Sequence, residues 1–173
     1  MTQPWLSNSK LPPPVSSEVL IPGYWLRYGS VIDRAALVRV VQRTYQELYP
    51  HEDFSHLATT VDQHFSKDTP LWWVQDQPAK SQPMTLPVGC LWLGNAIDQI
   101  TGDRHAHILL LYVIPERRRQ GIGTALVQRA AAWARARGDR QLGLQVFATN
   151  QPAINLYNGL GFQTQSFWML KPL

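Results

Sequence analysis

The chain has 173 residues, 45% of them hydrophobic and 16% charged, which is the size and composition of one globular domain with a sizeable core. Its longest apolar run, residues 108–114, is too short for a membrane-spanning helix, the N-terminus lacks the pattern of a secretory signal, and one cysteine, Cys90, cannot form an internal disulfide. The formal net charge of +4 is uneven, because residues 1–104 hold eight Lys and Arg against ten Asp and Glu, whereas residues 105–173 hold eight against two.

These features predict a cytoplasmic protein with no membrane segment. No cluster of histidine and cysteine has the spacing of a zinc site, so no bound metal is expected either. The charge asymmetry predicts a polyanionic ligand near the C-terminal half. Nucleic acid would satisfy this requirement, and so would a coenzyme that carries several phosphate groups.

Apolar periodicity, capping residues and helix breakers divide the chain into ten predicted elements. In chain order these are a strand at 24–28, helices at 33–48 and 55–65, strands at 71–74, 88–93 and 105–114, a helix at 121–137, a strand at 141–147, a helix at 150–161 and a strand at 162–170. Residues 1–20, with three consecutive prolines and several serines, are expected to form a poorly ordered arm before one domain over 21–173. The stretch 77–87 is expected to be a long mobile loop.

The most informative segment joins the predicted strand at 105–114 to the predicted helix at 121–137. Gly121 and Gly123 let the backbone approach a ligand closely, and several main-chain N–H groups there have no partner inside the helix. Such donors, together with the positive end of the helix dipole, suit phosphate oxygens. The adjacent arginines at 117–119 add forked, permanently charged donors. The segment therefore predicts a site for a pyrophosphate group, and nucleic acid is not expected as a partner.

The spacing of this segment resembles one family of enzymes. It is not a P-loop, because Thr124 and Ala125 follow the second glycine, nor a dinucleotide fingerprint, because residue 126 is Leu. The order Arg118-x-x-Gly121-x-Gly123, directly after a strand that ends in Val-x-Pro, resembles the acetyl-CoA-binding motif of the GNAT superfamily of N-acetyltransferases.

A second motif strengthens this resemblance. Residues 150–162 are similar, position for position, to the second cofactor motif of the family, N-x-x-A-x-x-L-Y-x-x-x-G-F. The resemblance implies an α/β (α+β) fold with a single domain, in which about four helices flank a mixed, mostly antiparallel sheet of six to seven strands. The implied order is β-α-α-β-β-β-α-β-α-β. The implied activity is transfer of an acetyl group from acetyl-CoA to a primary amine, by direct attack in a ternary complex.

The resemblance also implies which residues bind acetyl-CoA. Main-chain groups of Leu111 and Val113 are expected to bond the pantetheine arm as an added strand, and a strand amide is expected to polarise the thioester oxygen. Gly121 and Gly123 are expected at the pyrophosphate, while Asn150 has a competing role as a helix cap. The full set of cofactor-binding candidates is Leu111, Tyr112, Val113, Arg118, Arg119, Gln120, Gly121, Ile122, Gly123, Thr124, Asn150 and Tyr157.

Tyr157 is the candidate general acid. The leaving group is a thiolate with a pKa near 8.5, and a phenol within hydrogen-bonding reach can donate to it. The alternative is that Tyr157 is only a core aromatic residue on a packed helix.

The general base is open. Many family members carry a glutamate on the strand that corresponds to 105–114, and this strand has no acidic residue. His107 is the main candidate, because a pKa near 6.5 suits proton abstraction, although a histidine at a strand start is often only a surface residue. His105, Glu52, Asp53 and a relay of water molecules are the alternatives. Period-two alternation is expected to place on one face His105, His107, Leu109, Leu111 and Val113.

The acceptor amine is also open. Acidic and aromatic residues would attract a cationic amine, and the substrate-binding candidates are Glu52, Asp53 and Trp73. Aromatic residues that either line a cleft or belong to the core are Tyr45, Tyr49, Phe54, Trp72, Trp73 and Trp92. Polyamines, aminoglycosides, amino acids and protein N-termini all fit. A non-catalytic acyl-CoA sensor of the same fold is the alternative function, and a homodimer through the last strand is plausible by family analogy.

Overall fold

The computed structural model describes residues 17–76 and 87–173. Its elements are β1 (Glu18–Ile21), β2 (Tyr24–Tyr28), a 3-10 turn η1 (Val31–Asp33), α1 (Arg34–Leu48), α2 (Leu57–His64), β3 (Leu71–Gln75), β4 (Gly89–Ile97), β5 (Arg104–Val113), a 3-10 turn η2 (Pro115–Arg117), α3 (Ile122–Ala136), β6 (Leu142–Leu144) and α4 (Gln151–Gly159). Most of the arm expected at 1–20 and of the loop expected at 77–87 lies outside the described residues.

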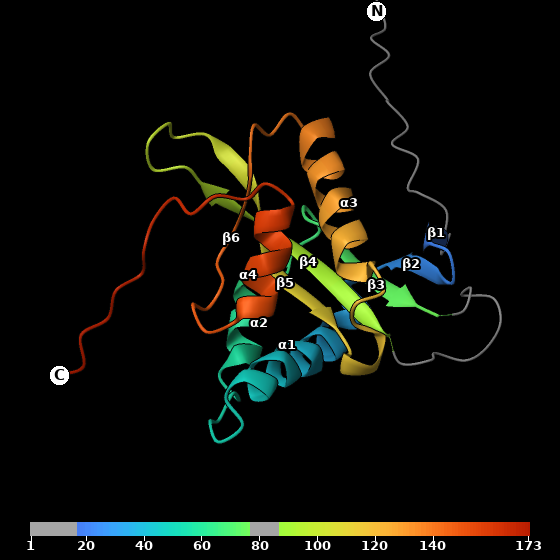
Figure 1. The fold of residues 1–173 in the computed structure, drawn as a ribbon, viewed down its shortest axis with the longest axis horizontal. Coiled ribbons are helices and arrows are strands. Elements are labelled where there is room, and N and C mark those ends of the chain that lie inside the picture. The colour runs from blue at the N-terminus through green and yellow to red at the C-terminus, as the bar shows by residue number, and fades with distance from the viewer. Residues whose placement is uncertain (1–16, 77–86) are drawn as a thin grey trace, which may run out of the picture.

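The described strands form one sheet in sequence order, β1 to β6. Neighbouring strands from β1 to β5 are antiparallel, and β6 alone runs parallel to its neighbour β5. Helices α3 and α4 cover one face of the sheet, whereas α1 and α2 cover the other (Figure 1). The predicted α/β fold, with a mixed, mostly antiparallel sheet of six strands and four helices, is therefore confirmed.

Each face of the sheet has its own apolar core, and β3 contributes to both. Trp72 packs in the core under α3, and its neighbour Trp73 packs in the core under α1, because successive side chains of a strand point to opposite faces. Both rings are 1% exposed. We call these the α3-side core and the α1-side core.

A bulge interrupts the alternation of β5. Its pairing with β4 jumps from Leu110 opposite Trp92 to Ile108 opposite Leu93, so Leu109 is an extra residue. Leu109 and Leu110 both pack against the α1-side core, whereas Leu111 packs against the α3-side core. The expectation that His107 and Leu111 share a face is therefore wrong.

The two strands β5 and β6 part soon after they meet. Only Ala106–Ile108 of β5 pair with Leu142–Leu144 of β6. Beyond this point the second edge of β5, over residues 109–113, has no neighbouring strand among the described residues. The strand predicted at 141–147 is thus shorter than expected, and a gap opens between β5 and the segment that leads to α4.

Two other expectations about strands are wrong. Residues 18–21, assigned to the arm, form β1 as the antiparallel partner of β2. Residues 162–170, predicted as a last strand, have no regular secondary structure, and the chain beyond α4 runs away from the sheet (Figure 1). Four consecutive apolar residues of this segment are 76–87% exposed: Phe167, Trp168, Met169 and Leu170. A strand requires a hydrogen-bonded neighbour, and no strand lies beside this segment in the described chain.

Candidate active site at the gap between β5 and β6

The loop between β5 and α3 adopts an unusual backbone conformation. Arg119 has a φ of 64° and is the one non-glycine residue with positive φ in the described chain. Gly121, which precedes α3, has a φ of 85° and also lies in the left-handed region. Residues of this handedness turn successive N–H groups toward a common side and form an anion-binding concavity.

The N–H groups of this loop are free to bind a ligand. The first main-chain bond of α3 is donated by Ala125 to the carbonyl oxygen of Gly121, at 3.0 Å. For residues 119–124, the N–H groups have no hydrogen-bond partner in the part of the chain that the structure describes. Six consecutive donors at the positive end of a 15-residue helix fit two linked phosphate groups.

Contacts to neighbouring strands hold the loop in place. The side chain of Gln120 accepts a hydrogen bond from the hydroxyl of Tyr24 on β2. Arg117 forms an ion pair with Asp76 at 3.1 Å. These two side chains are therefore occupied with positioning the loop, and the main chain is left to bind the ligand.

The side chain of Arg118 is bonded to β5 and to α1. Its Nε donates to the carbonyl oxygen of Val113 at 2.8 Å, and its Nη2 donates to Oε2 of Glu47 at 2.5 Å. The guanidinium group also lies 5.8 Å from the centre of the Tyr112 ring. In this conformation the side chain of Arg118 joins β5 to α1, and its donors are occupied by Val113 and Glu47.

Glu47 is a residue of this site that the sequence did not reveal. Its Oε1 accepts a hydrogen bond of 2.6 Å from the hydroxyl of Tyr112. Burial alone would raise the pKa of Glu47, but the hydrogen bonds from Tyr112 and Arg118 outweigh it and lower that pKa. A carboxylate with both oxygens bonded is a poor general base. In the sequence, Arg43 and Glu47 form an ordinary i,i+4 helix pair, and nothing indicates the contact with Tyr112.

The free edge of β5 lies next to the two cofactor motifs. The carbonyl oxygen of Val113 bonds to Arg118, so it is not part of the β4 ladder, and Leu111, two residues earlier, presents its main chain on the same side. A side chain at Gly123 would lie 3.3 Å from Leu156 on α4 and 4.0 Å from Leu111. Strand β5, the start of α3 and the side of α4 therefore converge, as the resemblance predicts.

Tyr157 is buried on α4 beside this edge. It is 9% exposed and packs against Phe162 with ring centres 5.5 Å apart. Gly161, at a φ of 86°, turns the chain so that Phe162 can return to this position. Burial raises the pKa of Tyr157 to about 12, so the phenol keeps its proton at neutral pH. The side chain of Asn150 accepts from the N–H of Ala153 at 3.3 Å, which confirms its role as helix cap.

His107 lies on the α1 side of the sheet. It pairs with Gly143 of β6, one residue before the last pair between β5 and β6. A side chain at Gly143 of β6 would lie 3.2 Å from its Nδ1, so the imidazole covers this glycine. Its Nδ1 is buried and has no partner among the described residues. Burial, and then the neighbouring His105, lower the pKa of His107 below its ordinary value of 6.5. The ring is therefore neutral near pH 7 and can accept a proton.

The three substrate-binding candidates differ in their surroundings. Glu52 is exposed in the connection between α1 and α2. Asp53 accepts from the N–H and the hydroxyl of Ser55, at 2.9 and 2.8 Å, and these bonds lower its pKa. Trp73 is fully buried in the α1-side core, so it lines no open surface and its assignment is not supported.

Four aromatic side chains from three segments meet on the α1 side of the gap. We call Tyr45, Tyr49, Phe54 and Phe147 the aromatic collar. The ring of Phe147, in the segment after β6, lies 5.7 Å from Tyr45 and 5.4 Å from Tyr49, and Tyr45 lies 5.5 Å from Phe54. The sequence indicated the first three but not Phe147. The side chains of Leu142, Leu144 and Val146 face α3. Alternation along an extended chain therefore places the next residue, Phe147, on the opposite face.

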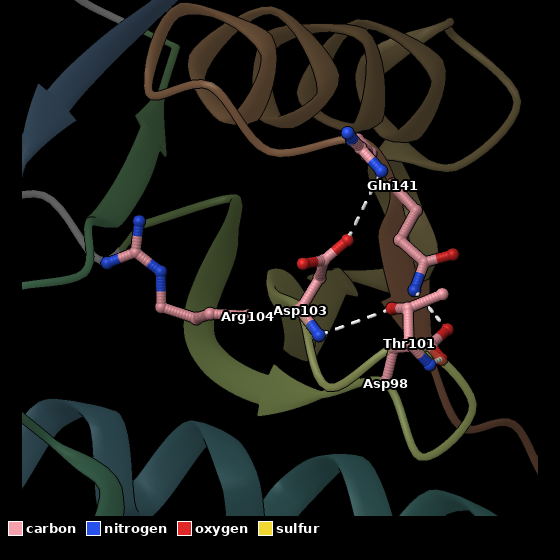
Figure 2. Close-up of a pocket in the computed structure, with 6 residues that line it drawn as sticks. Asp98, Thr101, Asp103, Arg104 and Gln141 are labelled. Carbon is pink, nitrogen blue, oxygen red and sulfur yellow. Dashed lines mark hydrogen bonds and ion pairs between the residues drawn. The ribbon is translucent and has the colours of Figure 1, made fainter.

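A polar hollow at the other end of β5 has a structural explanation. Figure 2 shows Gln141 beside Asp98, and Asp103 beside Thr101, around the turn between β4 and β5. The amide of Gln141 donates to Asp98 at 2.6 Å, and this bond, with those from two main-chain N–H groups, lowers the pKa of Asp98 to about 2. These groups bond to one another and fasten the turn to the start of β6.

Comparison with known proteins gives the class of this chain. The profile of the acetyltransferase (GNAT) family matches residues 34–162, and the chain belongs to this family. It is 26% identical, over 141 residues, to an N-alpha-acetyltransferase of Sulfurisphaera tokodaii, a match that covers 81% of this chain and 80% of the relative. An uncharacterized N-acetyltransferase of Methanocaldococcus jannaschii is 37% identical over 82 residues, which are 44% of this chain and 34% of that protein.

The solved structures agree in fold. A predicted acetyltransferase of Clostridium acetobutylicum, solved with acetyl-CoA, matches with a TM-score of 0.66 and 16% identity, over 86% of this chain and 96% of that one. Within the described residues, no helix is long and apolar enough to cross a bilayer, and no group of three or more His, Cys, Asp or Glu could hold a metal ion. The matches to the first two curated relatives span only about a third of their lengths.

Proposed function

We propose that this chain is an acetyl-CoA-dependent N-acetyltransferase that acts on a primary amine by direct attack in a ternary complex. The observation that carries this proposal is the row of N–H groups at 119–124, which have no partner within residues 17–76 and 87–173, beside the free edge of β5. The pyrophosphate would bind these donors, and the amides of the pantetheine arm would add to the strand edge. The neighbour of similar fold that was solved with acetyl-CoA supports the choice of ligand.

The residues around the gap have distinct roles in this proposal. Acetyl-CoA supplies the thioester carbonyl that the amine attacks. An alkylamine has a pKa of about 10.4, so almost all of it carries a proton near pH 7, and that proton must be removed. Neutral His107, on the α1 side, can take the proton through a water molecule. Tyr157, on the α3 side, can donate to the sulfur that leaves.

Other features of the protein stay predictions. These are a cytoplasmic location, a homodimer and the absence of nucleic-acid and membrane partners. With β1 included, we assign residues 17–173 to one acetyltransferase domain.

The first test combines binding and turnover. Calorimetry with acetyl-CoA, CoA and a DNA duplex should give binding of both coenzymes and no binding of DNA. Release of free thiol from acetyl-CoA should then require one member of a panel of primary amines. Binding without thiol release from any amine would favour the sensor of the same fold, and binding of DNA alone would contradict the proposal.

The role of His107 predicts a particular pH dependence. Measured at saturating amine, kcat should fall as the pH decreases through the pKa of His107, which lies below 6.5. In His107→Gln this limb should disappear, and kcat at pH 7.5 should decrease by about 10²-fold, as for loss of a general base. His105→Gln is the control: loss of the neighbouring positive charge should raise the pKa of His107 and move the limb to higher pH. An unchanged profile in His107→Gln would assign the proton to water.

A further inference from the structure

The aromatic collar stands at the entrance to the gap on the face opposite α3. Ile108 pairs with Leu144, the last residue of β6, and Phe147 follows three residues later in the segment that leads to α4. Phe147 follows the β6 wall of the gap, whereas Tyr45 and Tyr49 belong to α1, which packs across the same face. The rings therefore connect α1 to the segment after β6, where the pairing of that segment with β5 has ended.

The collar presents accessible apolar surface. Phe147 is 42% exposed and Tyr49 is 36% exposed, although large aromatic side chains are usually buried. The rings contact one another in tilted and edge-to-face pairs, which fix their positions and leave part of the ring surfaces of Phe147 and Tyr49 exposed to solvent. An apolar chain that enters the gap would replace water on these rings.

The charges around the collar fit a single ammonium group. Three carboxylates occur between residues 45 and 56, and two of them are already bonded. Glu47 bonds to Tyr112 and Arg118, and Asp53 bonds to Ser55. Only Glu52 makes no side-chain hydrogen bond or ion pair in the described chain, and Arg43 lies on the same helix as Glu47. Glu52 and Asp53, which pair with no cation in the described chain, can attract the ammonium group, whereas a second ammonium group on the acceptor chain would lie against the apolar rings.

We infer that the acceptor is a primary amine with a single positive charge on an apolar or aromatic chain, and that the aromatic collar selects it. The inference rests on the proposed N-acetyltransferase activity and adds the class of substrate. The chain would lie against Phe147 and Tyr49, and the amine would reach the free edge of β5. Polyamines and aminosugars, which carry several charges or hydroxyl groups, would be poor acceptors.

A series of n-alkylamines tests this inference with the intact protein. From n-butylamine to n-heptylamine, kcat/KM should increase by about two- to fourfold for each added methylene, since burial of one methylene contributes about 0.8 kcal/mol. The matched control is 1,7-diaminoheptane, which has the same length and a second ammonium. Its kcat/KM should be at least tenfold below that of n-heptylamine, because the second charge would lie among the rings.

The Phe147→Ala variant tests whether the aromatic collar causes the dependence of kcat/KM on the length of the amine. Phe147→Ala should reduce the increase per methylene to less than 1.5-fold. Ile100→Ala is the control, because it shortens an apolar side chain that is 93% exposed at the β4–β5 turn, and it should keep the full dependence on chain length. The KM for acetyl-CoA should stay constant in both variants.

The possible outcomes separate the two proposals. Turnover that is independent of chain length, or that favours diamines or aminosugars, would overturn the inference about the acceptor and leave the acetyltransferase assignment intact. An equal dependence on chain length in Phe147→Ala and the parent would overturn the role of the collar. Failure of every amine to release thiol would overturn both proposals.

Discussion

Replacement of Gly121 by alanine should weaken acetyl-CoA binding by about 10- to 100-fold. Gly121 has a φ of 85°, and a non-glycine residue in this region costs about 1–2 kcal/mol, so the loop will relax toward another conformation. A side chain at this position would meet only Ile21, at 4.0 Å, so the effect comes from the backbone and not from a clash. Loss of one N–H bond to a phosphate oxygen would cost about 1.5–3 kcal/mol, which corresponds to the stated factor.

Gly138 offers a matched control at the other end of α3. It has a φ of 90°, and a side chain there would touch nothing within 4 Å. Gly138→Ala should therefore lower the free energy of unfolding by about 1–2 kcal/mol, the cost of a non-glycine residue at positive φ. The Kd for acetyl-CoA from calorimetry should stay within twofold of the parent. Equal losses of affinity in both variants would mean that stability, and not the loop, controls binding. Unchanged affinity in Gly121→Ala would remove the loop from the binding site.

The parts of the fold that depend on local chemistry could be predicted from the sequence. Both ends of α4 were expected from Asn150 and Gly161, and the structure shows the Asn150 cap and the left-handed turn at Gly161. The loop before α3 was expected from Gly121 and its neighbours for the same reason. Capping and positive φ are properties of a few adjacent residues, so a sequence pattern contains the necessary information.

The parts that depend on distant strands could not be predicted. Whether Leu109 forms a bulge is decided by its pairing with β4, and the pattern of β5 alone suggests a regular strand. The segment 162–170 has enough apolar residues for a strand, but no strand of residues 17–76 or 87–161 lies beside it. Residues 18–21 form a strand because β2 lies beside them, although their position near a proline-rich arm suggested otherwise.

The same distinction applies to the site. The proposed phosphate-binding loop is continuous in sequence, whereas Glu47 and Phe147 join the proposed site through contacts with residues far along the chain. Helix α1 makes two of these contacts: Glu47 reaches the cofactor side through Tyr112 and Arg118, and Tyr45 reaches the acceptor side through Phe147. One helix therefore adjoins both proposed substrate sites, and a single sequence gives no indication of this arrangement.

Removal of the Tyr157 hydroxyl should lower kcat far more than it weakens acetyl-CoA binding. With a pKa of about 12, Tyr157 is a weaker acid than the thiol of CoA, whose pKa is near 8.5, so complete proton transfer would be uphill by about 5 kcal/mol. The phenol is therefore expected to act as a hydrogen-bond donor to the sulfur as negative charge develops. A bond to a charged group contributes about 1.5–3 kcal/mol, which predicts a decrease in kcat of about 10- to 100-fold in Tyr157→Phe.

Phenylalanine keeps the ring that packs against Phe162, so the melting temperature and the Kd for acetyl-CoA should change little. Tyr28→Phe is the control, because it removes a phenol hydroxyl that accepts a hydrogen bond from Arg129 in the middle of α3, and its kcat should equal that of the parent. The pKa of Tyr157 also predicts the shape of the pH profile of kcat at alkaline pH. A donor with a pKa of about 12 stays protonated up to about pH 11, so the parent should lose no kcat between pH 9 and about 11 through ionisation of Tyr157. A decrease centred near pH 10 that is absent in Tyr157→Phe would mean that the tyrosine is more exposed to water than its position on α4 indicates, and an unchanged kcat in the variant would end its assignment as the donor.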